Sequence, residues 1–95
     1  MSTWDETRIL VLAELSLEGS AMNEAALAGD LDESRFRAAL IATKAEECGL
    51  AAIATAARDV ECVLGRPGTE PAGAYGESML RLATVISQDP GFVPL

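Results

Sequence analysis

The side chains that could carry chemistry in this chain are carboxylates, two cysteines and one lysine, because histidine is absent. Histidine is the commonest general base among side chains and the commonest metal ligand. Without it, the serines and cysteines lack the usual partner that activates a nucleophile. Cys48 and Cys62 alone also fall short of the ligand set of a closed zinc site. The sequence therefore predicts a protein that is not an enzyme and that has no catalytic residue, metal site or cofactor.

The remaining charged side chains are typical of a solvated surface. Lys44 is the only lysine, and Glu46 and Glu47 follow it closely. Neighbouring residues on a helix do not face each other, so Glu46 and Glu47 are poorly placed to act as an acid and base pair. The charges at Asp5 and Glu6, and at Asp59 and Glu61, are most simply solvated faces or helix-cap residues. We therefore expect this chain to act by binding.

The charge balance excludes two classes of partner. Fifteen acidic and seven basic residues give a net charge of −8 and a pI near 4.3. A phosphate backbone and an anionic membrane surface would both repel such a chain, so we expect no nucleic-acid or membrane partner. The acidic balance indicates either simple solubility or a partner with a basic docking face.

The N-terminal residues point to the cytoplasm. Residues 1–6 contain no basic stretch before the first apolar run, so no signal peptide is expected. The apolar run over 9–17 is interrupted by Glu14 and is too short to span a bilayer. In a cytoplasmic protein Cys48 and Cys62 are expected to be reduced.

Amphipathic helices must position these side chains. Over residues 31–64 the apolar residues recur at steps of three and four, which is the spacing of one helix face. This stripe consists of Ala38, Ile41, Ala42, Ala45, Cys48, Ala52, Ile53, Ala56, Val60, Val63 and Leu64. Alanine, the strongest helix former, is the commonest residue, and no segment alternates like a strand. We predict an all-α chain that forms one domain over 1–95, with its core over about 3–88.

Capping residues and glycines predict the helix boundaries. Thr3 and Glu6 form a capping-box pattern that would begin the first helix, and Gly19 would end it. A short additional helix would cover 20–28. Asp30 and Asp32 are alternative caps for the next helix. Gly49 is either a tolerated mid-helix glycine or a helix end, and we predict an end followed by a helix over 50–64.

The remaining segments are a loop, a final helix and a tail. Residues 65–73 contain two prolines and three glycines and are predicted to be a flexible loop. The last helix is expected over 74–88, and the apolar tail 89–95 is expected to pack back on the core. The predicted buried stripe of the last helix is Tyr75, Met79, Leu82, Ala83 and Ile86. The fold predicted is an antiparallel four-helix bundle with one short additional helix.

Residues 36–61, FRAALIATKAEECGLAAIATAARDVE, resemble the core of the histidine phosphotransfer (HPt) family. That family carries a pattern close to A-H-x-L-K-G-x-A-x-x-L-G across a helix break. Gly49 matches the glycine of the break, while Ile41, Ala45 and Cys48 match buried positions before it. The resemblance implies an HPt-like bundle and a place in two-component phosphorelay signalling.

The signature residues of the family are missing. The resemblance places Ala39 at the phospho-accepting histidine, Ala42 at the lysine and Thr43 at the glycine. A register that puts Lys44 at the family's lysine would expose Ile41, so we reject it. The resemblance thus implies a degenerate HPt-like protein that binds a response-regulator receiver domain without phosphotransfer. It also implies a docking face that consists of Arg35, Ala39, Ala42, Thr43 and Glu46.

A second hypothesis follows from charge alone. An acidic helical inhibitor could bind a basic surface on a regulatory protein, although the acidic residues are dispersed along the chain. Added salt would weaken such binding steeply, whereas docking through small residues would lose little.

Overall fold

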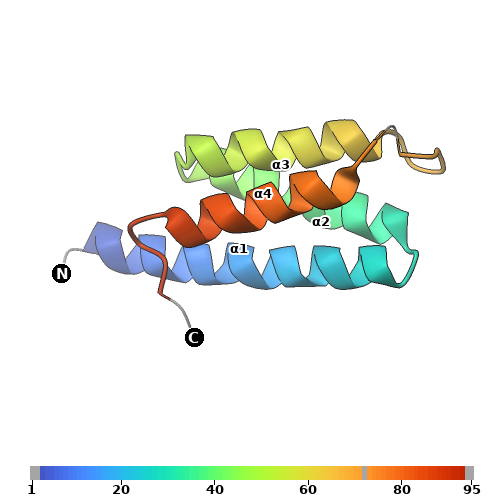
Figure 1. Cartoon of the computed structure of the whole chain (residues 1–95). Coiled ribbons are helices and arrows are strands. Elements are labelled where there is room, and N and C mark those ends of the chain that lie inside the picture. The colour runs from blue at the N-terminus through green and yellow to red at the C-terminus, as the bar shows by residue number, and fades with distance from the viewer. Residues whose placement is uncertain (1–2, 72, 94–95) are drawn as a thin grey trace.

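The computed structural model describes residues 3–71 and 73–93, with side chains from residue 6 onward. These residues form four α-helices and no strand, which confirms the all-α prediction for the part described. The helices are α1 (Thr3–Leu27), α2 (Leu31–Glu47), α3 (Ala51–Leu64) and α4 (Tyr75–Gln88) (Figure 1). None of them is both long and apolar enough to cross a bilayer, in the residues described.

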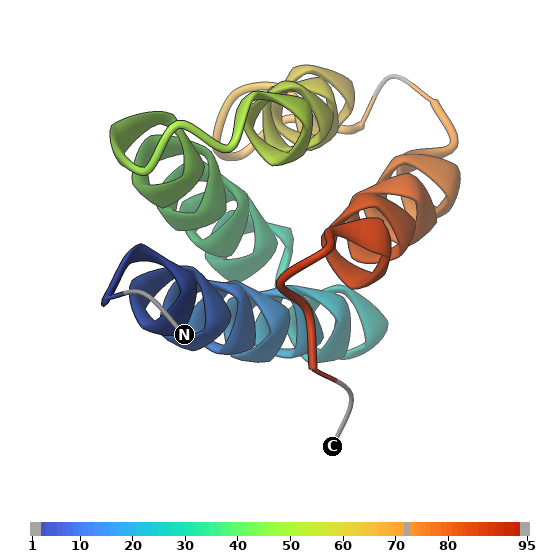
Figure 2. The same ribbon diagram turned by 90° about the vertical axis from the view of Figure 1, so that its left-hand side faces the viewer.

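The four helices surround one apolar core. α1 packs against α2 and α4, and α3 also packs against α2 and α4, so the helices stand around the core as a ring (Figure 2). The largest fully buried apolar side chains are Leu12, Leu15, Met22, Ile41, Ile53, Val60, Leu64 and Leu82. The molecule is elongated along the helix axes, with extents of 45 × 23 × 17 Å.

Of the two caps predicted as alternatives for α2, the structure uses Asp30 and not Asp32. The Asp30 side chain accepts a hydrogen bond from the Glu33 N–H at 3.1 Å, so Asp30 is the N-cap. One turn later the Glu33 carboxylate accepts a hydrogen bond from Arg37 at 2.8 Å, at the i,i+4 spacing.

The predicted helix break at Gly49 is confirmed. Gly49 adopts φ of +72°, a left-handed conformation that glycine reaches without a steric penalty. The Leu50 N–H then donates to the Ala45 carbonyl at 2.8 Å, and the Gly49 N–H donates to the Glu46 carbonyl at 3.2 Å. This pair of bonds is a Schellman motif, which satisfies the last carbonyls of α2.

The short additional helix does not exist. α1 runs without interruption from Thr3 to Leu27, and Gly19 lies inside it. Leu15 and Met22 lie two turns apart on the buried side, and both are 1% exposed. Burying such side chains stabilises a fold by about 1.5–3 kcal/mol each, which outweighs the cost of about 1 kcal/mol for a mid-helix glycine.

Two alanines assigned to the buried stripes are exposed. Ala52 lies on the solvent side of α3, and Ala83 lies on the accessible side of α4. Alanine is a weak marker of burial because it also populates exposed helix positions freely. The side chain of Thr3, and with it the predicted capping box, lies outside the described side chains.

The segment directly after α4 is held against the beginning of α1. The Arg8 guanidinium donates two hydrogen bonds to the Asp89 carboxylate, at 2.9 and 2.6 Å. A Cβ atom on Gly91 would lie 3.0 Å from a Leu12 methyl group and 3.1 Å from the Arg8 side chain, so this segment approaches α1 closely. Phe92 packs against the core, as predicted for the tail, but Val93 is 57% exposed, and residues 94–95 lie outside the described part.

Candidate partner-docking face

The five residues predicted to form a docking face do not share one surface. Thr43 and Glu46 are exposed and Ala39 is partly exposed, but Arg35 is 8% exposed and Ala42 is fully buried. The prediction that Arg35 faces outward is therefore wrong, as is the placement of Ala42 at an accessible surface. The reason is that α2 packs against α1 on one side and α3 on the other, so its buried face is wide.

The Arg35 guanidinium completes the C-terminal end of α3. Its Nη2 donates to the carbonyls of Leu64 and Thr69, both at 2.7 Å. Its Nη1 donates to the Asp32 carboxylate at 2.6 Å, and the same carboxylate oxygen accepts the Gly68 N–H at 3.2 Å. The last carbonyls of a helix lack partners and carry partial negative charge, which a guanidinium satisfies. Arg35 is therefore a structural residue that joins α2, α3 and the following loop.

Glu46 is accessible but already has a partner. Arg58 of α3 donates to its two carboxylate oxygens at 2.6 and 3.1 Å, and donates to Glu61 at 2.7 Å. The hydrogen bond from Arg58 lowers the pKa of Glu46, despite some opposing desolvation. Because both side chains are about half exposed, the pair adds little stability. Glu46 is thus accessible, but its carboxylate is already paired with Arg58 of α3.

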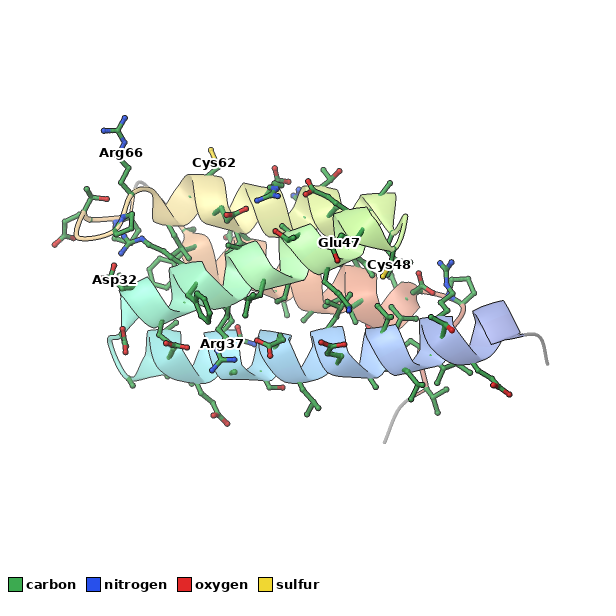
Figure 3. All side chains as sticks on the ribbon, turned by 180° about the vertical axis from the view of Figure 1, so that it is seen from behind. Asp32, Arg37, Glu47, Cys48, Cys62 and Arg66 are labelled. Carbon is green, nitrogen blue, oxygen red and sulfur yellow. The ribbon has the colours of Figure 1, made fainter. Side chains whose placement is uncertain are left out.

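Two large apolar residues on the exposed side of α2 were missed. Phe36 is 54% exposed and Leu40 is 40% exposed. Together with Ala39, Thr43 and Glu47 they form the α2 outer face. Figure 3 shows α2 in front of α4, with Glu47 of this face labelled. Phe36, Leu40, Thr43 and Glu47 follow one another at spacings of four and three, which is one helix face. This spacing could have indicated a second apolar face on α2, because these residues are not part of the predicted buried stripe.

Charged side chains lie along one edge of the α2 outer face. The Arg37 guanidinium lies 5.8 Å from the centre of the Phe36 ring. It donates to Glu18 at 2.9 Å and to Glu33 at 2.8 Å, and the bond to Glu18 raises the pKa of Arg37. Beside Leu40, a hollow of about 200 Å³ opens between α1 and α2. The lining of this hollow is mixed: it combines Leu15, Leu40 and Thr43 with the charged side chains of Glu14, Glu18, Lys44 and Glu47.

The described residues contain no cluster of three or more histidine, cysteine or acidic side chains that could hold a metal ion. The two thiols are free, Cys62 exposed on α3 and Cys48 partly buried after α2. Figure 3 shows them on different elements, well separated along the molecule. Neither thiol faces a histidine, since the chain has none.

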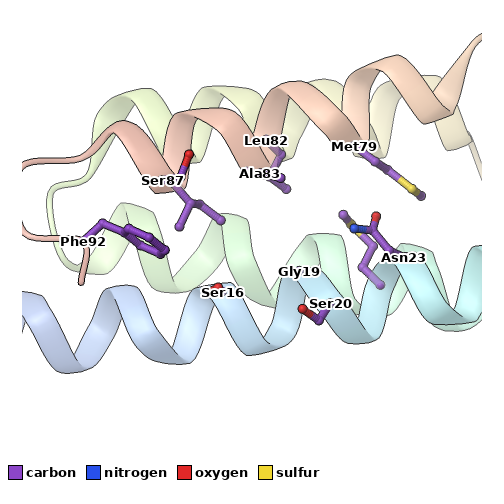
Figure 4. Close-up of a pocket in the computed structure, with 11 residues that line it drawn as sticks. Ser16, Gly19, Ser20, Asn23, Met79, Leu82, Ala83, Ser87 and Phe92 are labelled. Carbon is purple, nitrogen blue, oxygen red and sulfur yellow. The ribbon is translucent and has the colours of Figure 1, made fainter. Parts of the chain in front are cut away.

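A second concave feature, here named the α1–α4 groove, lies between those two helices (Figure 4). It consists of two adjoining cavities of about 120 and 340 Å³, which share Asn23, Met79 and Ala83. Asn23 and Met79 extend toward each other from the two helices, and Phe92 lies at one end. The sequence predicted Met79 to be buried, but gave no signal for an opening at this helix pair.

Comparisons with protein-family models, with curated proteins and with solved structures found no match for this chain.

Proposed function

We propose that this protein is an HPt-like signalling protein of the two-component phosphorelay type, which binds a response-regulator receiver domain without phosphotransfer. The observation that carries the proposal is the α2 outer face, where the exposed Phe36 and Leu40 lie beside the small side chains of Ala39 and Thr43. Exposed apolar side chains that follow one helix face are typical of a helix that packs against a partner.

The proposal assigns the chain an antiparallel bundle of the HPt type and a cytoplasmic location. It is supported by the helix break at Gly49 and by the burial of Ile41 and Ala45, which the family pattern places in the core. Ala39, at the position of the phospho-accepting histidine, is partly exposed. A methyl group offers no nitrogen to accept a phosphoryl group, so contact at Ala39 would leave the phosphoryl group on its donor. The protein would then act by occupying the receiver domain and not by catalysis.

Binding to purified receiver domains tests this proposal. We expect at least one member of a panel of receiver domains to bind in a calorimetric titration. Thr43→Arg should weaken that binding at least about tenfold, or about 1.4 kcal/mol, because it places a large side chain beside Leu40 where the partner would approach closely. Thr84→Arg is the matched control, since Thr84 is also an exposed helical threonine and, among the described residues, no Cα atom of α4 lies within 8 Å of a Cα atom of α2.

The salt dependence of binding distinguishes receiver-domain docking from the acidic-inhibitor hypothesis. Contact through apolar and small side chains should change little with added salt, whereas an acidic surface on a basic partner should lose affinity steeply. Absence of binding to every receiver domain, or equal loss with Thr43→Arg and Thr84→Arg, would refute docking by the α2 outer face. Salt-sensitive binding to a basic regulator instead would favour the inhibitor.

A further inference from the structure

Arg37 lies between two carboxylates and an exposed aromatic ring. It extends from α2 toward α1, where its Nη1 donates to Glu18 at 2.9 Å, while its Nε donates to Glu33 of α2 at 2.8 Å (Figure 3). The two bonds leave from different nitrogens of one planar group, so they set both the position and the tilt of the guanidinium. Its central carbon lies 5.8 Å from the centre of the Phe36 ring.

Phe36 is the side chain that this cation can orient. It is 54% exposed, and an aromatic side chain on a helix has two accessible χ1 rotamers, at about 180° and −60°. A guanidinium over the face of an aromatic ring attracts the ring when it lies within about 6 Å of the ring centre. Because two carboxylates fix the guanidinium of Arg37, this attraction favours the one rotamer that keeps the ring beneath it.

We propose that Arg37 is a positioning residue for docking, which holds the Phe36 ring in one orientation on the α2 outer face before a receiver domain arrives. An aromatic side chain that is already held in one rotamer loses less conformational entropy when a partner binds it. Arg37 acts through Phe36 and needs no contact of its own with the partner. This inference rests on the proposed function, because it takes the α2 outer face as the docking surface.

Arg58 provides a comparison within the same molecule. It also donates to carboxylates on two helices, Glu46 of α2 and Glu61 of α3. Glu46 lies about 15 Å along α2 from Phe36, at a rise of about 1.5 Å per residue. Both arginines form partly exposed ion pairs, so the loss of either should lower the stability only slightly. Only the loss of Arg37 should release the Phe36 ring.

Three-bond NMR couplings about the Cα–Cβ bond of Phe36, measured on the free full chain, test whether the ring is held. We expect one χ1 rotamer in the wild type and averaging between two rotamers in Arg37→Gln, which removes the cation but keeps a side chain of similar length. Arg58→Gln is the matched control and should leave the Phe36 couplings unchanged. Phe92, the other phenylalanine of the chain, packs against the core and is the internal reference.

Calorimetric titration with a receiver domain that binds the wild type tests the effect on docking. Arg37→Gln should raise the dissociation constant about three- to tenfold, because binding must then order the ring. The same substitution should change the affinity little in a Phe36→Ala background, since the ring that Arg37 positions is absent. A purely structural residue would cost the same affinity in both backgrounds. Circular dichroism checks that every variant is folded.

The two measurements separate failure of the positioning role from failure of the proposed function. Averaged Phe36 couplings in the wild type, or couplings that Arg37→Gln leaves unchanged, would overturn the positioning role whether or not a receiver domain binds. Equal losses of affinity from Arg37→Gln with and without the Phe36 ring would also overturn it. A held ring with no binding to any receiver domain would refute the proposed function, and with it the role of Arg37 in docking.

Discussion

Adjacent alanines on α2 have opposite environments, and one charged side chain can distinguish them. Ala38 is fully buried, whereas Ala39 is partly exposed on the α2 outer face. Ala38→Arg should lower the free energy of unfolding by several kcal/mol, because it buries an unpaired charge. Ala39→Arg should change it by less than about 1 kcal/mol, while abolishing any receiver binding. Urea denaturation followed by circular dichroism measures both variants, and the reverse order would contradict the orientation of α2.

Arg35, which was predicted to lie on the docking face, is instead a buried structural residue. Arg35→Ala should lower the free energy of unfolding by about 2–4 kcal/mol, because it leaves the Leu64 and Thr69 carbonyls without their donor. Arg35→Lys should recover only part of this loss, since one ammonium cannot reproduce the planar set of donors. Arg66→Ala is the control, because Arg66 is exposed in the loop after α3 that also contains Thr69. Chemical denaturation gives the three values, and equal stability of all three variants would contradict the structural role.

At the scale of the helices, two glycines should respond in opposite ways to the same substitution. Gly49→Ala should destabilise the protein by about 1 kcal/mol, because alanine is strained at φ of +72°. Gly19→Ala should stabilise it by about 0.5–1 kcal/mol, since Gly19 is helical and a Cβ there meets no atom within 4 Å. Thermal melts of both variants make the comparison. A stabilising Gly49→Ala would mean that α2 and α3 can join into one helix.

At the scale of the whole molecule, one ion pair joins residues 81 positions apart. The two hydrogen bonds from Arg8 hold the pKa of Asp89 below its ordinary value near 3.8, against some desolvation, with a further contribution from the Gly91 N–H. A carboxylate with a lowered folded-state pKa stabilises the protein above its unfolded pKa, and this stability is lost as pH falls through the folded value. The Arg8–Asp89 ion pair between α1 and the segment after α4 is therefore weakened only at acidic pH.

Asp89→Asn tests this link between α1 and the end of α4. We expect the substitution to cost about 1–2 kcal/mol of unfolding free energy at pH 7, and the difference from wild type to shrink below about pH 4. Asp59→Asn, which removes one charge from an exposed position on α3, should cost almost nothing at either pH. Urea denaturation at several pH values provides the comparison. A pH-independent difference for Asp89→Asn would show that packing, and not charge, makes the contribution.

The features that were predictable from sequence depend on residues within a few positions of one another. The helix start near Asp30, the helix end at Gly49 and the loop before α4 all follow from local hydrogen bonding or backbone conformation. The absence of histidine likewise removes phosphohistidine chemistry from this chain whatever its fold.

Features set by packing between helices required the tertiary structure. α1 continues through Gly19 because the buried Leu15 and Met22 need one common helix face. Arg35 is buried because the end of α3 supplies its acceptors, 29 positions away in the chain. The accessible surfaces could not be read from periodicity, because alanine occurs on buried and exposed faces alike. Which faces of α1, α2 and α4 remain open is decided only when all four helices meet around one core.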